Sequence, residues 1–302
     1  MPTPFCASGN GSRLCVVHDM GGAVHCQAGG AALVLTVRTV HNVQPDASTL
    51  ANQPVVSIVI PTCNRLLLLR RCIEAVRAHV TLDKEVIVVD GASADGTGAW
   101  LAGQSGLRVI TESAREGPVR AFDKGFRAAS GTYLCWLNDD TYPLPGAVQA
   151  AVDMIERPDL ADVGLVAFYH DFDRERNRLD DVWHEGRRFS VYNVRGYPYA
   201  NFGLMRRELL VRLGYLDLRY RFAAWDPDLS LKVQLEAGLK VAGCRRAFIV
   251  HDELMDARKE ADLAHLEADN ALLFEKWKLP PRDSYPDPGP AYRAFLRQRG
   301  LC

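Results

Sequence analysis

The sequence predicts an α/β fold in which a mainly parallel central sheet is flanked by helices. Four apolar segments of strand length alternate with helical segments, and the connections between them are short. This alternation favours parallel strands, because a chain that returns to the same edge of a sheet needs a crossover helix. The predicted strands are residues 55–60, 85–90, 107–110 and 133–137.

The segments between these strands have the periodicity of helices that cover a sheet. In the first helix, apolar residues recur at positions i, i+3, i+4 and i+7, namely Leu69, Cys72, Ile73 and Val76. A later helix is expected over residues 121–129, directly before the fourth strand. Each helix would therefore pack one apolar face on the sheet.

Composition excludes partners that recognise a strongly charged protein. The 302 residues include 36 Lys and Arg against 37 Asp and Glu, so no net field attracts nucleic acid or an anionic membrane. No apolar run reaches the roughly 20 residues of a spanning helix. The first residues also lack the order of a secretory signal, so a cytoplasmic location is expected.

The two ends of the chain differ from the middle. Residues 1–52 are interpreted as an extension that is poorly ordered or adds one strand at residues 32–37. A helix is expected from about Asp256 to Trp277, with an irregular tail after it because prolines interrupt the sequence there. The Cys and His residues of the extension match no zinc-binding spacing; they are Cys6, Cys15, His18, His25 and Cys26.

The eight cysteines include no Cys-x-x-Cys pair. Cys63, Cys72 and Cys135 lie in segments that read as core or as the wall of a site. We therefore expect buried free thiols rather than disulfides.

The fourth predicted strand ends abruptly in Asn138, Asp139 and Asp140. In a parallel sheet the ligand crevice lies at the carboxyl ends of the strands, so these side chains are expected at its rim. A divalent cation or a hydroxyl-rich ligand would offset the repulsion between the two carboxylates. The alternative is an ordinary turn, since Asn-Asp-Asp-Thr followed by Pro143 has good turn chemistry.

The first strand-to-helix turn excludes two classes of nucleotide-binding site. Its sequence, Pro61-Thr62-Cys63-Asn64-Arg65, contains no glycine, whereas a dinucleotide-binding turn needs Gly-x-Gly-x-x-Gly. The phosphate-binding pattern Gly-x-x-x-x-Gly-Lys-Ser/Thr is also missing. Any phosphate must therefore be bound by side chains or by a metal.

Five motifs in order resemble those of the family 2 glycosyltransferases, which have the GT-A fold. They lie at residues 57–65, 88–97, 131–140, 213–217 and 225–229. The resemblance places a GT-A domain at residues 53–255, followed by a C-terminal helix and Pro-rich tail at residues 256–302. It implies inverting transfer of a sugar from a nucleoside diphosphate sugar to an acceptor hydroxyl.

The resemblance also assigns residues to the nucleotide. The loop after the first strand would hold base and ribose through Pro61, Thr62, Asn64 and Arg65, and the second strand would do so through its terminal acid, Asp90. An aspartate can accept the imide N–H of a pyrimidine, which favours a UDP- or dTDP-sugar, although Asp90 could instead be a loop or capping acid.

Further matches extend the nucleotide site and add a metal. Arg120 matches a basic position that reaches the base or phosphate. Where the family has Asp-x-Asp, this chain has Asn138, with ribose contact implied for Asp139 and ligation of Mn²⁺ or Mg²⁺ for Asp140. His251 matches the histidine on the far side of the metal and favours manganese, although a histidine at a strand end can also be a plain surface residue.

The catalytic base implied by the resemblance is Asp226, which would take the acceptor proton. The alternative is a helix cap, because Asp226-Pro227-Asp228 also reads as the start of a helix. Trp225 stands where the family has Glu and is expected on the acceptor side, together with Asp228. Gly203 is expected there too, as a site of close backbone approach.

Partners and alternatives follow from these assignments. The expected partners are the nucleotide sugar and a carbohydrate or lipid-linked acceptor, as in bacterial surface polysaccharide synthesis. A lipid-linked acceptor would bring the protein to the inner face of a membrane without a transmembrane segment. Two other functions stay open: a non-catalytic relative that binds nucleotide sugars, and a nucleotidyltransferase, which would want a Gly-rich basic loop after the first strand.

Overall fold

The computed structural model describes residues 54–302 except 172–176, 253 and 283. The expectations for residues 1–52, including the strand at 32–37 and the unmatched Cys and His residues, lie outside the described part. Every helix and strand named below belongs to one unit that begins at Asp46.

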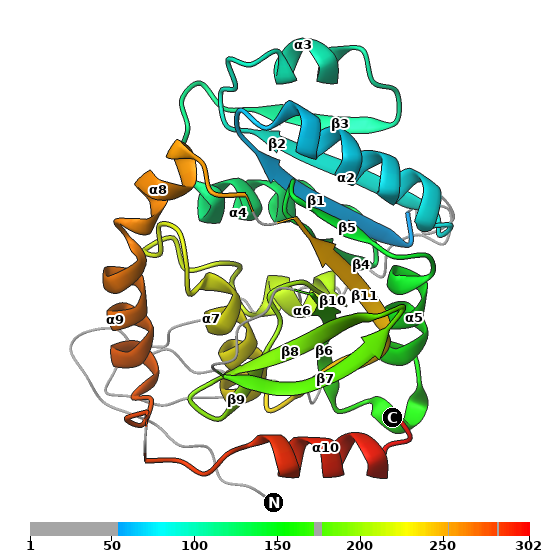
Figure 1. The fold of residues 1–302 in the computed structure, drawn as a ribbon, viewed down its shortest axis with the longest axis vertical. Coiled ribbons are helices and arrows are strands. Elements are labelled where there is room, and N and C mark those ends of the chain that lie inside the picture. Colours follow the sequence, from blue (N-terminus) through cyan, green and yellow to red (C-terminus); the bar gives the residue numbers. More distant parts are fainter. Residues whose placement is uncertain (1–53, 172–176, 253, 283) are drawn as a thin grey trace, which may run out of the picture. The chain divides into compact units, whose positions relative to one another are not determined.

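Four strands form the parallel half of the sheet, in the order β3-β2-β1-β4. Three helices connect them, as the alternation in the sequence predicts (Figure 1). The strands are β1 (Val56–Thr62), β2 (Lys84–Asp90), β3 (Leu107–Thr111) and β4 (Tyr133–Trp136). The helices are α2 (Leu66–His79), α3 (Thr97–Ala102) and α4 (Pro118–Ala128).

The sheet continues beyond β4 with mixed strand directions, in the order β10-β6-β11-β5. β10 (Gly203–Arg206) is antiparallel to β4 and to β6 (Val163–His170), while β11 (Lys240–His251) is parallel to β6. β5 (Thr141–Pro143) pairs with the end of β11. A side ribbon pairs with β6; its strands are β7 (Arg178–His184), β8 (Arg187–Val194) and β9 (Tyr197–Tyr199).

Helices cover both faces of this sheet. One apolar cluster joins α2, α3 and α5 (Ala147–Ile155) to the sheet, and all four residues of the predicted face of α2 are buried in it. The other cluster joins α4, α6 (Arg207–Arg212) and α7 (Trp225–Leu231) to the opposite face. A 3-10 turn at Pro158–Leu160 and a π-helix at Lys232–Glu236 complete these segments.

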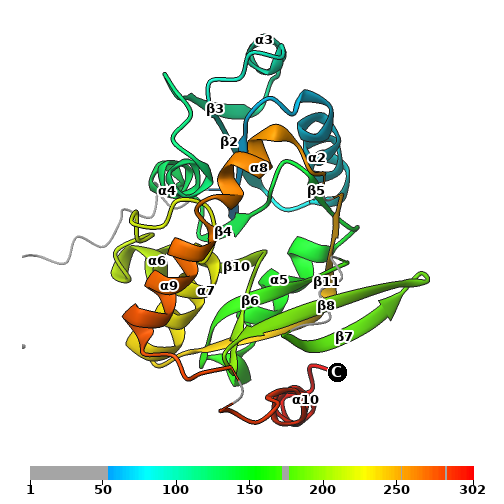
Figure 2. The same ribbon diagram turned by 60° about the vertical axis from the view of Figure 1, so that its left-hand side comes forward.

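The C-terminal region is more helical than the sequence predicts. The single helix expected from Asp256 to Trp277 is two helices, α8 (Ala257–Leu263) and α9 (Leu266–Trp277), which lie beside α7 and α4 (Figure 2). The expected irregular tail contains α10 (Gly289–Gln298). Its prolines do not prevent the helix because Pro290 lies in the first turn, where an N–H has no partner to lose.

The cysteines of the described part are free. Cys63, Cys72 and Cys135 are buried thiols, as predicted, and Cys244 is another. Burial raises the pKa of Cys135 above its ordinary value, so this thiol stays protonated and acts as a small apolar side chain.

Gly125 sets how closely α4 approaches β1. A Cβ added at this position would lie 2.2 Å from Cγ1 of Val59, whose side chain is fully buried. The β-branched Val59 has few alternative rotamers, so it cannot make room for an added methyl group. The α4 helix begins directly after Gly117 and contributes Pro118, Ala121 and Phe122 to the cavity described below, so this contact helps to position one wall of the site.

We expect Gly125→Ala to lower the free energy of unfolding by about 1–3 kcal/mol, because overpacking outweighs the better helix propensity of alanine. Urea denaturation would measure the change. Gly98→Ala in α3 is the matched control, since the nearest atom to its added Cβ lies at 3.6 Å. Equal stability of the two variants would contradict this account of the packing.

Candidate functional site

A cavity of about 630 Å³ lies at the carboxyl ends of β1 and β4. The turns after these two strands, at residues 61–65 and 138–140, form one wall. The start of α7, the end of β11 and helices α8 and α9 complete it. The rim of polar residues predicted at this edge of the sheet is therefore present.

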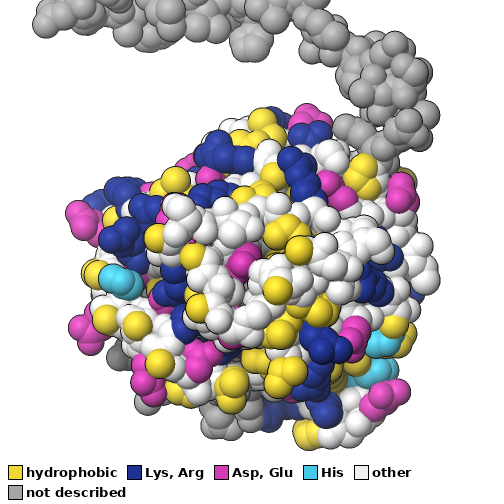
Figure 3. Space-filling model, turned by 90° about the horizontal axis from the view of Figure 1, so that it is seen from above, with side chains coloured by type: hydrophobic (Ala, Val, Ile, Leu, Met, Phe, Trp, Pro, Cys, Tyr) yellow, Lys and Arg dark blue, Asp and Glu magenta, His cyan; other side chains and the backbone are white. Residues whose placement is uncertain are grey.

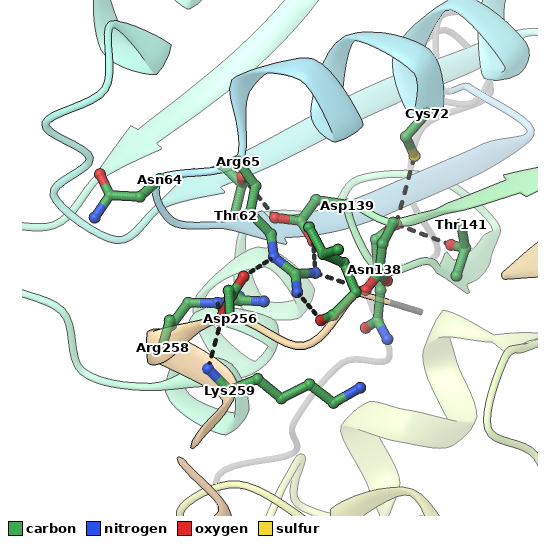
Figure 4. A network of polar contacts seen from close by, with 12 residues as sticks. Thr62, Asn64, Arg65, Cys72, Asn138, Asp139, Thr141, Asp256, Arg258 and Lys259 are labelled. Carbon is green, nitrogen blue, oxygen red and sulfur yellow. Dashed lines mark hydrogen bonds and ion pairs between the residues drawn. The ribbon is translucent and has the colours of Figure 1, made fainter. Parts of the chain in front are cut away.

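The centre of this wall is the guanidinium of Arg65. Its side chain is 3% exposed, and Nη1 lies 2.6 Å from Oδ2 of Asp140 and 3.3 Å from Oδ1 of Asp139. On its other side, Nε donates to Oδ2 of Asp256 at 2.7 Å, and Nη2 donates to the carbonyl of Leu254 at 2.8 Å. Figure 4 shows Arg65 between Asp139 and Asp256, the residue that precedes α8.

The two adjacent carboxylates are in different electrostatic states. Burial raises the pKa of Asp139, and the charge of Asp140 adds to this effect. Burial also acts on Asp140, but the neighbouring His251 and Arg65 outweigh it and lower its pKa. Asp140 therefore has the lower pKa of the two carboxyl groups.

Asn138 and Thr141 form the turn that the sequence allowed as an alternative. The Thr141 hydroxyl donates to the carbonyl of Asn138 at 2.8 Å, and Thr141 N donates to the same carbonyl at 3.2 Å. Thr62 donates to Oδ2 of Asp139 at 2.8 Å and so links the turn to β1. The turn and the ligand site are the same structure, because this turn brings Asn138, Asp139 and Asp140 to the cavity.

The residues proposed for a metal are two neighbouring ligands rather than a complete set. Oδ1 of Asp140 is buried without a hydrogen bond and lies 3.4 Å from Nε2 of His251. Within the described residues, no three His, Cys, Asp or Glu side chains are grouped as ligands for an ion. Two protein ligands suit a cation that completes its coordination with substrate phosphates and water.

Asp226 and Asp228, two residues apart on α7, have different surroundings. Asp226 lines the cavity and accepts a hydrogen bond from Nδ2 of Asn201 at 2.9 Å. It is not the helix cap that the sequence allowed, because α7 is preceded by Ala224 as its N-cap residue. Asp228 is buried away from the cavity lining, with Tyr220 and Trp277 donating to its Oδ1 and Lys276 pairing with it. This favours a structural role for Asp228 over the acceptor-side role expected from the sequence.

The other two acceptor-side residues also differ from each other. Trp225 lines the cavity and packs on Phe122, with ring centroids 4.6 Å apart. Gly203 is buried in β10 and does not line it. A Cβ at position 203 would lie 2.7 Å from the carbonyl of Val166 and 3.1 Å from the ring of Trp136. The close approach predicted for Gly203 is therefore an approach between strands, not to an acceptor.

Three residues expected at the nucleotide do not line the cavity. Asn64 points away from the Arg65 network (Figure 4), and its side chain accepts from Ala94 N at 2.6 Å. Asp90 is buried and accepts from the hydroxyl of Ser93 at 2.5 Å, as in the loop-acid alternative. Arg120 lines a separate hollow of about 260 Å³. Pro61, Thr62 and Arg65 do reach the cavity.

Sequence reasoning missed the basic residues that α8 brings to the site. Asp256 caps this helix by accepting from Lys259 N at 2.8 Å, and Arg258 and Lys259 both line the cavity. A weak signal for them exists in the sequence. Two cations in the first turn of a helix oppose its dipole and so favour a nearby anion, although part of that need is met by Asp256, whose Oδ1 lies 3.7 Å from Nε of Arg258.

Comparison with known proteins identifies the family of this chain. The sequence model described as glycosyl transferase family 2 matches residues 57–214, which is more than half of the chain. The chain belongs to this family. It is 26% identical over 217 residues to the uncharacterized glycosyltransferase YwdF of Bacillus subtilis, covering 69% of this chain and 78% of that protein.

This family 2 chain is also similar to a second relative in sequence and to a solved structure in fold. Over 100 residues it is 30% identical to the GalNAc(5)-diNAcBac-PP-undecaprenol beta-1,3-glucosyltransferase of Campylobacter jejuni, covering 32% of each protein. Its structure resembles the mannosyltransferase PcManGT of Pyrobaculum calidifontis in complex with GDP-Man and Mn²⁺. The TM-score is 0.57 at 22% identity, over 81% of this chain and 70% of that one. The predicted GT-A fold is thereby confirmed, and the enzyme is a glycosyltransferase.

We expect Arg65→Met to lower the free energy of unfolding by about 3–5 kcal/mol, because it leaves buried carboxylates without their cation. In an Asp140→Asn background the loss should be clearly smaller, and a double-mutant cycle in urea would measure the coupling.

Arg127→Met is the matched control for this cycle. Arg127 also pairs with an aspartate, but its side chain is 51% exposed, so the loss should be about 1 kcal/mol or less. Additive effects of the Arg65 and Asp140 substitutions would contradict the pairing.

Proposed function

We propose that this glycosyltransferase transfers a sugar, with inversion, from a nucleoside diphosphate sugar to an acceptor hydroxyl. The observation that carries the proposal is that Asp140 and Asp226 line one cavity from different elements, the turn after β4 and helix α7. A donor diphosphate at the first and an acceptor at the second would meet between them.

The proposed nucleotide site is the wall that contains Arg65. Pro61, Thr62 and Asp139 lie where base and ribose would contact the turns after β1 and β4. The basic residues Arg258 and Lys259 of α8 would offset the charge of the diphosphate. A UDP- or dTDP-sugar remains the proposed donor on the ground of the family similarity alone, since Asp90, which would recognise a pyrimidine, does not line the cavity.

Asp140 and His251 are the residues that would hold Mn²⁺ or Mg²⁺. When bound, such a cation neutralises charge on the departing diphosphate. The buried Oδ1 of Asp140 has no hydrogen bond of normal geometry within the described residues and lies 3.4 Å from Nε2 of His251, so one ion would reach both side chains. When no donor is present, the guanidinium of Arg65 offsets the negative charge of Asp139 and Asp140.

Asp226 is the proposed base. Inversion requires one group that takes the acceptor proton while the diphosphate leaves from the opposite face of the sugar. Asp226 contributes a carboxylate at the cavity wall, whereas Asp228 is enclosed by Tyr220 and Trp277. The ring of Trp225 next to Asp226 gives the acceptor an aromatic surface to pack on.

The proposed acceptor is a carbohydrate or a lipid-linked saccharide. The name of the Campylobacter relative specifies an acceptor attached to undecaprenol diphosphate. An acceptor of this kind would bring the enzyme to a membrane, so we propose a cytoplasmic protein with peripheral contact at the inner face. In the described part of the chain, no helix is both long and apolar enough to cross a bilayer. Basic side chains on the face seen in Figure 3 are scattered among acidic and apolar ones.

One experiment tests this function against its alternatives. The protein, Mn²⁺ and a panel of UDP- and dTDP-sugars are mixed with saccharide acceptors, and release of nucleoside diphosphate is measured. We expect release with at least one donor. Binding without release would instead identify a non-catalytic relative, and release of pyrophosphate from a nucleoside triphosphate and a sugar phosphate would identify a nucleotidyltransferase.

We expect Asp226→Asn to lower kcat at least about 100-fold, because a carboxamide cannot take the acceptor proton. Asp228→Asn should act mainly on stability, since it weakens the contacts with Lys276 and Trp277. Steady-state kinetics with thermal denaturation would separate the two effects. The assignment is wrong if Asp226→Asn stays within a few-fold of wild type while folded Asp228→Asn is inactive.

Metal binding should depend on the nucleotide. Two protein ligands, one of them already beside Arg65, are too few for tight binding, so we expect calorimetry to detect Mn²⁺ appreciably only when UDP or another nucleoside diphosphate is present. Tight binding by the protein alone would contradict this arrangement.

A further inference from the structure

The carboxylate of Asp226 is linked through Asn201 to His170. Nδ2 of Asn201 donates to its Oδ2 at 2.9 Å, and Oδ1 of the same amide lies 3.1 Å from Nε2 of His170. The three side chains come from α7, from the segment before β10 and from the end of β6. All three residues line the cavity.

The chemistry of these groups determines the direction of each hydrogen bond. An ionised carboxylate can only accept, so the NH₂ group of Asn201 must face Asp226. The amide oxygen then faces His170, and since that oxygen also only accepts, the proton of this contact must be on Nε2 of His170. The orientation of the amide and the protonation of Nε2 are thus both required by the charge of Asp226.

The two residues are held in place by packing. His170 is 3% exposed and lies between the rings of Tyr192 and Phe202, with centroids at 5.2 and 5.3 Å. The backbone carbonyl of Asn201 accepts from Nε1 of the buried Trp136 at 2.9 Å. The donor to Asp226 is therefore presented from a rigid part of the core.

We propose that Asn201 is a positioning residue that holds the carboxylate of Asp226 in the orientation for proton transfer, with His170 setting the orientation of the Asn201 amide. The inference rests on the proposed function. In that step the acceptor O–H bond breaks and its proton passes to Asp226. The acceptor oxygen bonds to the anomeric carbon, and the bond from that carbon to the diphosphate breaks.

Two substitutions separate positioning from packing. Asn201→Asp keeps the shape of the side chain but removes the donor, and the two carboxylates would then repel each other or share a proton. Asn201→Ala removes both shape and donor. If Asn201 only fills space, the aspartate variant is the better enzyme; if it positions Asp226, the aspartate variant is the worse one.

We expect kcat for release of nucleoside diphosphate, with a donor that the wild type uses, to fall about 100-fold in Asn201→Asp and about 10-fold in Asn201→Ala. KM for the donor should stay within about threefold in both, because Asn201 does not act on the donor. His170→Phe keeps a ring but loses the N–H, and should lower kcat about 10-fold. Thermal denaturation and calorimetry with UDP and Mn²⁺ would verify that each variant is folded and binds nucleotide.

The matched control is Gln234→Glu, the same change from amide to acid beyond the end of α7. Gln234 donates to the carbonyls of Pro198 and Ser230 and does not contact Asp226, so kcat should be retained. A folded Asn201→Asp variant within threefold of wild type, or one more active than Asn201→Ala, would overturn the inference alone. No release by the wild type with any donor would overturn the proposed function, and this inference with it.

Discussion

The site depends on one buried cation between three carboxylates. Arg65 pairs with Asp139 and Asp140 on one side and with Asp256 on the other, and its side chain is almost completely enclosed. Two adjacent buried aspartates would not stay together without such a partner, because desolvation and mutual repulsion both oppose their charge. The guanidinium also keeps its charge, since the carboxylates raise its pKa against the effect of burial.

This arrangement links segments that are distant in the sequence. Arg65 is the N-cap residue of α2, the two aspartates follow β4, and Asp256 caps α8 nearly 200 residues later. The cap places Arg258 and Lys259 at the cavity, so the residue that balances the carboxylates also orders the basic residues proposed to meet the diphosphate. A bound donor would add the negative charge of its diphosphate, and its metal would add positive charge. Both would act on the ion pairs that Arg65 makes with Asp139 and Asp140.

The sequence predicts the parallel half of the fold well. Apolar strand segments that alternate with amphipathic helical segments are compatible with only a few sheet topologies. The sequence also places Asp139 and Asp140 at the cavity, because they follow the end of a buried strand, whereas Asp226 and His251 are placed there only by their match to the family motifs. It predicts less about side chains whose position depends on residues far away in the sequence. Nothing local indicates that Asp228 is enclosed by Trp277 or that Asn201 reaches Asp226. The bond between Asp90 and Ser93 is local, and the sequence allows it as the loop-acid alternative. The sequence does not predict α10, because its prolines indicate helix breaks, whereas Pro290 lies in the first turn of this helix.

The central claim is that Asp140 and Asp226 serve one reaction from different walls of the same cavity. A crystal structure of the protein with UDP and Mn²⁺ tests it most directly. The account predicts the ion between Asp140 and the diphosphate, with the diphosphate end of the nucleotide directed toward Asp226. A nucleotide bound outside this cavity, or an ion that does not contact Asp140, would contradict it.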